Sequence, residues 1–286
     1  MFKRIALITN SGGDKIIETL RTVTGFLKNR DLDVTLDESC AALIPDSGLP
    51  VAADEDLGQQ CDMAIAIGGD GTMLKAARLL ADRNVPLLGI NRGQLGFLAD
   101  IPAESVEEHL EQILEGNFYE EERFQLHCQV DRDGKTITES DAFNDVIIQK
   151  WNIAKLIQLT TYVNGKLVNS QRSDGLIIAS PTGSTAYALS GGGPILHPSL
   201  DALVLVPICP HTLSNRPLVI DGNSTIEIVV GTPEIDHARL TCDGEIKREL
   251  ATGDRIKIHK KDKKIKLIHP ADHDHFNILR AKLNWG

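Results

Sequence analysis

The first third of the chain alternates short apolar runs with amphipathic stretches. The apolar runs predict strands at 5–9, 33–36, 62–67 and 85–91, and the amphipathic stretches predict helices at 15–29, 73–82 and 104–115. The run of 62–67 has no polar alternation, which is typical of a parallel strand covered on both faces. The polar stretch 43–60 is expected to be a loop. Repeated strand–helix units predict an α/β domain with a mostly parallel sheet.

Beyond about residue 122 the apolar runs become strand-like and turn signals follow at short intervals. Strands are expected at 124–130, 156–163, 176–179, 225–230, 237–242, 255–259 and 264–269. Hairpin turns are predicted at 131–135, Asn164-Gly165 and Asp243-Gly244, because Asp-Gly and Asn-Gly pairs favour the tight turns that join antiparallel strands. The basic run 260–266 is expected to be a solvated turn. This part of the chain therefore predicts a β-rich domain, with at most one short helix, after Gly183.

The last residues predict a helix again, over 272–284, with Phe276, Leu279 and Leu283 on one side. A lone amphipathic helix must bury its apolar side, so we expect it to return to the helix-rich first domain. The predicted division is therefore an α/β domain of 1–122 with the tail 270–286, and a β-rich domain of 123–269.

Composition is that of a soluble globular protein, with 42% hydrophobic and 24% charged residues among 286. No run of about 18 apolar residues occurs, so no membrane span or membrane partner is expected. Residues 1–10 are typical of a first strand rather than a signal peptide. The five cysteines are scattered and form no CxxC pair, which favours reduced core thiols in a cytoplasmic protein.

The net charge of −10 argues against a nucleic-acid or acidic-membrane partner, because such binding needs a basic face. A polyphosphate ligand would have to be neutralised locally, by amides, a few Lys or Arg residues and Mg²⁺. The nine histidines show no convincing metal-ligand spacing, and His273 and His275 are expected to be exposed. No metal site made by protein side chains is predicted.

The densest chemical signal is Gly68-Gly69-Asp70-Gly71-Thr72, directly after the predicted strand of 62–67. Its glycines let the backbone approach a ligand, and Thr72 is expected to cap the next helix, whose first N–H groups attract anions. A carboxylate is unexpected in an anion-binding turn. Asp70 could accept a proton from a hydroxyl, orient that hydroxyl, or hold Mg²⁺ beside phosphate. The alternative is a purely structural turn whose Asp bonds local amides.

Two further stretches carry candidate chemistry. Residues 172–194 gather hydroxyls and glycines, which could bind phosphate and sugar groups at close range. Tyr187 in the same stretch could stack on a base. A Ser/Thr/Gly-rich loop without a ligand is the alternative. Asn144-Asp145 precedes an apolar run, where the Asn amide matches the edge of an adenine and Asp145 could accept from a ribose hydroxyl. Such a dipeptide is also common in plain turns.

Together the three stretches resemble the NAD kinase family. The turn Gly68–Thr72 alone is also similar to turns of lipid kinases and 6-phosphofructokinases. Ser173-Asp174-Gly175 followed by 181–187 (PTGSTAY) is far more specific to NAD kinases. The resemblance continues at 91–98, at 192–195 and at 210–219, so that it covers nearly the whole chain and is greatest to bacterial members.

The resemblance implies transfer of the γ-phosphoryl group of ATP to the 2′-hydroxyl of the adenosine ribose of NAD, giving NADP and ADP. It implies Mg²⁺ or another divalent cation with ATP, a homo-oligomer (dimer or tetramer), a nucleotide-binding first domain and a NAD-binding second domain. The family's catalytic aspartate falls on Asp70. Its ligand contacts fall on Asp70, Gly71, Phe97, Asn144, Asp145, Lys155, Arg172, Asp174, Thr182, Thr185, Ala186, Tyr187, Ala188, Leu189, Ser190, Asn215 and Glu245. Asp145 stands where many members have Glu, which shortens its reach by one methylene.

Two other functions fit parts of the sequence. A lipid kinase would share Asp70 and its glycines, but should also have an exposed apolar entrance or a basic membrane-facing patch, neither of which is clear here. A non-catalytic dinucleotide sensor would bind NAD or NADP without ATP turnover, and the presence of Asp70 argues against it. His211 could be catalytic, although a histidine in such a loop is more often structural.

Overall fold

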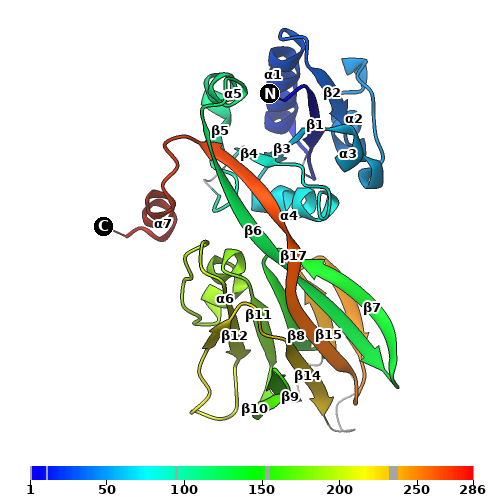
Figure 1. Cartoon of the computed structure of the whole chain (residues 1–286), viewed down its shortest axis with the longest axis vertical. Helices are drawn as coiled ribbons and strands as arrows, with labels where there is room; N and C mark the ends of the chain where they lie inside the picture. Colours follow the sequence, from blue (N-terminus) through cyan, green and yellow to red (C-terminus); the bar gives the residue numbers. More distant parts are fainter. Residues whose placement is uncertain (1, 11, 94–95, 152–154, 232–237, 286) are drawn as a thin grey trace. The chain divides into compact units, whose positions relative to one another are not determined.

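The computed structural model describes residues 2–10, 12–93, 96–151, 155–231 and 238–285 (Figure 1). The chain divides into two compact units, Met1–Glu122 with Lys263–Gly286 and Arg123–Asp262. The expected domains and these units differ at the second boundary, which is 269/270 for the expected domains and 262/263 for the units. The two differ because one strand, 255–270, runs through the boundary between the units. The division at 122/123 and 269/270 stays a prediction about separately folding domains.

The first unit is an α/β structure. Its elements are β1 (Arg4–Ile8), α1 (Asp14–Lys28), β2 (Asp33–Leu36), α2 (Glu38–Leu43), α3 (Asp54–Gln60), β3 (Met63–Gly68), α4 (Asp70–Leu79), β4 (Leu87–Asn91), β5 (Ile101–Pro102), α5 (Val106–Leu114) and α7 (His275–Leu283). The strands follow the order β17-β4-β3-β1-β2, and each described neighbouring pair is parallel. The predicted mostly parallel sheet is confirmed.

The central strands β3 and β4 are buried at every position, so both faces of the sheet are covered. A close approach at Gly89 of β4 brings α4 and the following loop onto one face. A Cβ there would lie 2.7 Å from the Cα of Ala99 and 2.8 Å from the sulfur of Met73. Only glycine permits this approach, which brings the loop after β4 close to the start of α4.

Two local predictions for the first unit were wrong. The stretch 43–60 contains α3, whose first turn is acidic and whose Leu57 is fully buried, so a short helix is stabilised by its dipole and one apolar anchor. The helix expected from Met73 begins already at Asp70, with Gly69 as its N-cap, so Thr72 lies within the helix and is not the cap.

The second unit is β-rich. Its elements are β6 (Phe118–Arg132), β7 (Lys135–Ala142), β8 (Asp145–Lys150), β9 (Ile157–Val163), β10 (Lys166–Ser173), β11 (Gly175–Ala179), α6 (Tyr187–Ser190), β12 (Ala202–Ile208), β13 (Leu218–Asp221), β14 (Ile226–Gly231), β15 (Ala238–Cys242), β16 (Ile246–Leu250) and β17 (Arg255–Pro270). Strand β6 begins and β17 ends in the first unit.

Two antiparallel arrangements enclose the core of the second unit. One has the order β10-β9-β14-β17 with the β6–β7 hairpin on β17, and the other has the order β13-β12-β11-β8-β15-β16. A single buried cluster joins Leu126 and Ile228 of the first arrangement to Ile148 and Leu205 of the second. The predicted β-rich domain is confirmed, and α6 is the short helix expected after Gly183.

All three predicted hairpin turns are present. Asp133 and Asn164 have φ of 50°, Asp243 has 49°, and each is followed by a glycine with positive φ. Two successive residues in the left-handed region are typical of the turn whose twist matches that of the flanking strands.

The basic run 260–266 was predicted wrongly as a turn between two strands. Strand β17 is continuous through this run, because lysines near both of its ends form ion pairs with acidic residues. Lys260 pairs with Asp201 at 2.8 Å and Lys261 with Asp141 at 2.5 Å. Lys264 and Lys266 pair with Glu122 and Glu120. These partners lie 59 to 146 residues away in the sequence, so the run by itself indicates only polarity.

Four of the five cysteines are buried and Cys209 is exposed, so the expectation of core thiols was wrong for Cys209. Among the described residues no helix is long and apolar enough to span a membrane.

The tail helix α7 belongs to the first unit, as expected. Asp274 caps it by accepting from the N–H of Phe276 at 2.8 Å. The expected apolar side is only partly correct, because Ile278 and Leu279 are buried whereas the Phe276 ring is 56% exposed. Leu283 is half-buried.

Truncating two of the apolar residues of α7, Leu279 and Phe276, should therefore have unequal effects. We expect Leu279→Ala to lower the free energy of unfolding by about 2–5 kcal/mol, because it removes a fully buried side chain. Phe276→Ala, the matched control, should change it by less than about 1 kcal/mol. Urea unfolding followed by circular dichroism measures both, and equal losses would contradict this packing of α7.

Candidate functional site

The candidate residues of the first unit gather at the carboxyl edge of its sheet. Asp70 follows β3, residues 96–99 follow the neighbouring β4, and Asn10 follows β1 on the other side. Because parallel strands end at one edge, these three segments meet there although they are far apart in sequence. The Thr72 hydroxyl donates to Oδ1 of Asn10 at 2.6 Å and joins two of them.

Three backbone N–H groups hold the carboxylate of Asp70. Phe97 donates to Oδ2 at 2.9 Å, and Leu98 and Ala99 donate to Oδ1 at 3.0 and 3.4 Å. We call this arrangement the Asp70 cradle. The N–H groups fix the orientation of the carboxylate and leave one of its roughly four lone-pair positions, on Oδ2, for a ligand. Asp70, Gly71 and Phe97 thus lie together, and their contact with a ligand stays a prediction.

Gly96 makes the cradle possible. A Cβ at this position would lie 2.2 Å from Oδ1 of Asp70 and 3.2 Å from the Ala99 carbonyl oxygen. Sequence reasoning missed this role, because nothing in the chain indicates which carboxylate Gly96 faces. Among the described residues, none lies within 4 Å of a Cβ placed on Gly93, so the two glycines differ in their surroundings.

A second carboxylate organises the candidate residues of the other unit. Asp243 accepts from the backbone N–H groups of Phe143, Asn144 and Asp145, at 2.9, 2.8 and 3.3 Å. Its own N–H donates to the Asp145 carbonyl at 3.0 Å. The sequence predicted Asp243 only as a turn residue. Its left-handed φ of 49° at the β15–β16 hairpin aims the side chain back at the start of β8.

The neighbouring Asp145 is an unusual buried acid. Its side chain is only 3% exposed, and burial, together with repulsion from Asp243, raises its pKa to about 7. Both effects penalise the charged form. Asp145 therefore changes its charge near neutral pH.

The Ser/Thr/Gly-rich segment packs directly against Asn144. Ser180 donates through its N–H to the Asn144 carbonyl at 2.9 Å, and a Cβ on Gly183 would lie 2.1 Å from that carbonyl oxygen. The Arg123 guanidinium donates to the Thr182 hydroxyl at 3.2 Å. These contacts fix where the segment begins, next to Asn144.

The rest of that segment covers the outer face of the β11–β12 pair. Ala188 is buried against Ile177 and Val206, and a Cβ on Gly191 or Gly193 would lie 2.8 Å from Val206. The ring of Tyr187 stays 42% exposed and is free to contact a flat ligand.

The remaining predicted residues of the second unit lie in three places. Asp174 forms an ion pair with Lys150 at 2.6 Å, and the Asn215 amide donates to Gln171 at 3.2 Å. Arg172, next to Gln171, is exposed. Glu245 is exposed in the same hairpin as Asp243. Lys155 is exposed at the start of the described stretch before β9.

A groove of about 350 Å³ lies beside Asn215. Its lining residues are Gly191, Pro207, Pro210, Thr212, Leu213, Asn215, Arg216 and Pro217. It adjoins the end of the Thr182–Ser190 segment at Gly191.

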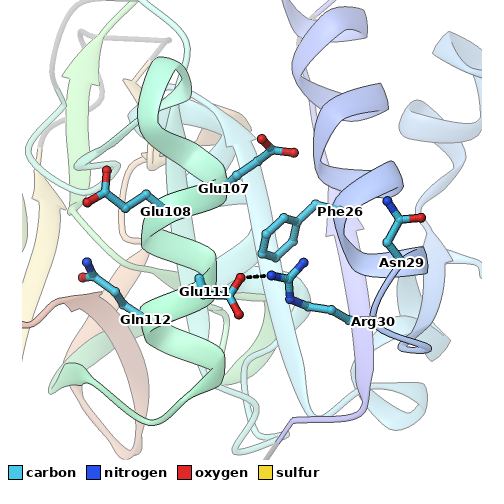
Figure 2. Close-up of a pocket in the computed structure, with 7 residues that line it drawn as sticks. All are labelled: Phe26, Asn29, Arg30, Glu107, Glu108, Glu111 and Gln112. Atoms are coloured by element: carbon cyan, nitrogen blue, oxygen red, sulfur yellow. Dashed lines mark ion pairs between the residues drawn. The ribbon is translucent and has the colours of Figure 1, made fainter.

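A second groove, in the first unit, does not suit a phosphorylated ligand. Figure 2 shows it between α1 and α5, lined by Phe26, Asn29, Arg30, Glu107, Glu108, Glu111 and Gln112. Arg30 lies 3.7 Å over the Phe26 ring and pairs with Glu111, so the one cation of the lining is already neutralised. The groove lies at the end of α1, which returns toward the amino edge of the sheet, away from Asp70.

Comparison with known proteins gives consistent matches along the chain. The ATP-NAD kinase N-terminal domain model matches residues 5–118, and the ATP-NAD kinase C-terminal domain model matches residues 143–270. The NAD kinase of Pseudomonas syringae pv. syringae (strain B728a) is 47% identical over 285 residues, which cover 100% of this chain and 96% of that protein. The NAD kinase of Ectopseudomonas mendocina (strain ymp) is 46% identical over 285 residues, 100% of this chain and 97% of that protein.

Two solved structures share the fold. An NAD kinase from Archaeoglobus fulgidus in complex with ATP has a TM-score of 0.77 and 25% identity, over 99% of this chain and 100% of that chain. A yeast NADH kinase complexed with NADH has a TM-score of 0.92 and 24% identity, over 99% of this chain and 88% of that chain. The fold class predicted from the sequence is confirmed.

Asp145 should make stability depend on pH in an unusual direction. A pKa raised from the ordinary 3.8 to about 7 means that the native state binds more protons between these values, so the free energy of unfolding falls as pH rises through this window. The shift corresponds to at most about 4 kcal/mol. Urea unfolding at about pH 4 and about pH 8 should show a smaller fall for Asp145→Asn than for the wild type. A fall of the same size in both proteins would refute the assignment.

Proposed function

The chain belongs to the ATP-NAD kinase family and is a NAD kinase, and from this premise we propose that Asp70 orients the acceptor hydroxyl and takes its proton. The reaction transfers the γ-phosphoryl group of ATP to the 2′-hydroxyl of the adenosine ribose of NAD, giving NADP and ADP. The observation that carries the proposal is the Asp70 cradle, in which three N–H groups orient a carboxylate at the ligand-binding edge of the sheet.

The cradle suits a late proton transfer. Phosphoryl transfer passes through a loose transition state with little bond formation to the attacking oxygen, so positioning and charge neutralisation matter more than a strong base. Three N–H donors stabilise the negative carboxylate and hold its remaining lone pair in one direction. Asp70 thereby orients the 2′-hydroxyl first and accepts its proton as the bond to phosphorus forms.

The residues around Asp243 form the proposed adenosine site of the second unit. Asp243 holds the backbone of Asn144 and Asp145 rigidly, so the Asn144 amide can present its donor and acceptor to an adenine edge. Asp145 accepts from a ribose hydroxyl, and Tyr187 offers an exposed ring for stacking. Thr182, Thr185 and the segment 186–190 are proposed to contact the same ligand.

Further contacts are proposed from the resemblance. Asp174, Arg172 and Asn215 belong to or adjoin β10, and Lys155, Glu245 and Gly71 complete the set of ligand-contacting residues. Asp174 is held by Lys150, which keeps the carboxylate ready to accept hydroxyls of the sugar. Arg172 is exposed and can reach a phosphate oxygen.

Mg²⁺ is the proposed metal partner of ATP. It prefers oxygen ligands and keeps several waters, so phosphate oxygens and water would supply its ligands. The one free lone-pair position of Asp70, on Oδ2, serves the 2′-hydroxyl. When bound, the ion neutralises charge on the phosphates, while Asp70 retains its role toward the hydroxyl.

We also propose a cytoplasmic homo-oligomer, either dimer or tetramer. Leu213 is 91% exposed, and Leu218 and Val219 near it are 39% and 44% exposed, which is typical of an association surface. The cysteines are free thiols, which favours a reducing compartment.

The cradle predicts that orientation matters as much as charge. Asp70→Asn should lower kcat by at least ~10²-fold, because the general base is lost and an amide NH₂ would oppose an N–H donor. Gly96→Ala keeps the carboxylate but displaces it, and we expect a loss of kcat of at least about 10-fold. Steady-state kinetics with NAD and ATP measure both, with Gly93→Ala as the control that should behave as wild type.

Wild-type turnover of Asp70→Asn would remove Asp70 from the mechanism. Equal activity of Gly96→Ala and Gly93→Ala would show that the cradle does not orient the carboxylate during turnover.

The adenosine site predicts selectivity for the acceptor. Asn144→Ala should raise KM for NAD by roughly 10-fold or more and leave KM for ATP nearly unchanged, because a bidentate adenine contact contributes about 1–3 kcal/mol. The analogue 2′-deoxy-NAD should bind weakly and consume no ATP, since it leaves buried polar groups unpaired. Calorimetry with both dinucleotides tests this. Equal loss of NAD and ATP affinity would assign Asn144 to the fold or to the phosphoryl donor.

A further inference from the structure

Two histidines and an aspartate converge in the first unit, outside the residues assigned to NAD or ATP. The Nδ1 atom of His269 lies 2.9 Å from Oδ2 of Asp100, and Nδ1 of His273 lies 2.7 Å from the same oxygen. One ligand-type atom from each residue falls within 4.8 Å of the other two. The imidazole rings stack, with centroids 4.0 Å apart, and the centroid of the Tyr119 ring lies 6.3 Å from that of His269 and 6.0 Å from that of His273.

The cluster is nearly closed to solvent. The side chains of His269, His273 and Asp100 are 1%, 6% and 8% exposed, so the expectation that His273 is exposed was wrong. Two of its polar atoms, Oδ1 of Asp100 and Nε2 of His269, have no hydrogen-bond partner among the described residues. Such orphaned buried atoms are costly unless another group satisfies them.

A divalent metal ion would satisfy this arrangement. Two imidazole nitrogens and a carboxylate are a typical ligand set for zinc and its neighbours, cobalt and nickel. In a tetrahedral site with metal–ligand bonds near 2.0–2.1 Å, each histidine Nδ1 would lie about half an ångström farther from Oδ2 of Asp100 than it does here. The orphaned Oδ1 of Asp100 can supply a fourth contact if the carboxylate binds through both oxygens.

We propose that Asp100, His269 and His273 form a structural binding site for a zinc-class divalent metal ion. The donors distinguish this site from that of the Mg²⁺ carried by ATP, because Mg²⁺ selects oxygen ligands and keeps its waters. Burial of all three side chains leaves no room for a substrate on the ion, so its role is structural.

Glu121 is a positioning residue in this proposal. Its Oε2 lies 3.5 Å from Nε2 of His269, on the side of the ring away from Asp100. A ligand histidine usually directs its second ring N–H at a carboxylate, which fixes the ring orientation and raises its basicity. A small movement of Glu121 would complete this contact once Nδ1 of His269 binds the ion.

The ion would join three separate segments of the first unit. Asp100 directly follows Ala99, the last donor of the Asp70 cradle, while His269 lies at the end of β17 and His273 precedes α7. Metal binding would therefore link the cradle loop, residues 96–99, to the carboxyl end of β17 and to the tail helix. Without the ion, side-chain contacts such as those of Asp100 with the two histidines join these segments.

The charge states of the ligands set the conditions of the test. Burial by itself raises the pKa of Asp100, but hydrogen bonds from His269 and His273 outweigh it and hold the pKa at about 2. Burial lowers the pKa of His269, but its hydrogen bond to Asp100 and the negative charges of Asp100 and Glu121 outweigh this and raise it. Because a proton on Nδ1 competes with the metal, the titration belongs at about pH 8.

The experiment is calorimetric titration of the chelator-treated full chain with Zn²⁺ in a non-coordinating buffer containing excess Mg²⁺. We expect one Zn²⁺ per chain at micromolar or lower Kd, and a rise in Tm of roughly 5 °C at about 100 times Kd. His273→Gln should weaken binding by at least about 10-fold and Glu121→Gln by roughly 10-fold. Co²⁺ should give a visible absorption band in the wild type that His273→Gln lacks.

His273→Cys separates a metal site from a hydrogen-bonded network. Both His273→Gln and His273→Cys remove the imidazole donor to Asp100, but only the thiolate can bind zinc. The proposal expects His273→Cys to retain the zinc-dependent rise in Tm. His127→Gln breaks another histidine–aspartate pair, with Asp141 at 2.7 Å, and should bind zinc as the wild type does.

Three results would overturn the proposal. One is the absence of stoichiometric zinc binding by the wild type. Another is equal zinc affinity in the wild type and His273→Gln, which would place the ion elsewhere. The third is a wild-type Tm that Zn²⁺ does not raise, together with an equal fall of the zinc-free Tm in His273→Cys and His273→Gln, which would assign the cluster to hydrogen bonding alone.

Discussion

The unpaired backbone N–H groups at the carboxyl edge of the sheet are the constraint on which the candidate active site depends. After β4, the N–H groups of Phe97, Leu98 and Ala99 all point at one place, and a carboxylate satisfies them. Asp70 supplies it, which explains why a negative charge stands in a turn that would otherwise attract anions. The two interpretations of Asp70 drawn from the sequence are therefore compatible, since local amides bind it and thereby prepare it for a ligand.

The second unit uses the same device. Asp243 accepts from three consecutive backbone N–H groups, those of residues 143–145, and so fixes the start of β8. In each unit one acid orders a polar loop next to a buried strand, where the proposed ligand contacts lie. Asp70 and Asp243 differ in their neighbours. Asp243 stands beside Asp145, and burial together with repulsion from Asp243 raises the pKa of Asp145. One pair of aspartates therefore has two roles. Asp243 fixes the backbone, and Asp145 titrates near neutral pH.

Close backbone approach is the second requirement, and glycine meets it at particular positions. Gly96 leaves room for the carboxylate of Asp70, Gly89 lets α4 and the cradle loop approach β4, and Gly183 lies against the Asn144 carbonyl. Each contact joins segments that are distant in the chain. Glycines in the same loops, such as Gly93, have open space around them, so the residue type alone does not indicate which position is constrained.

Periodicity and turn chemistry determined the two-part architecture from the sequence alone, because they depend on neighbours within a few residues. The parallel strands, the three hairpin turns and the motif around Asp70 are of this kind. Only the tertiary structure decided that 260–266 is part of a strand, that Phe276 is exposed and that His273 is buried. It also decided that Gly96 and Asp243 serve the site. The physical reason is that these properties depend on partners far away in sequence: ion pairs hold the lysines of β17, and Asp100 meets two histidines about 170 residues later.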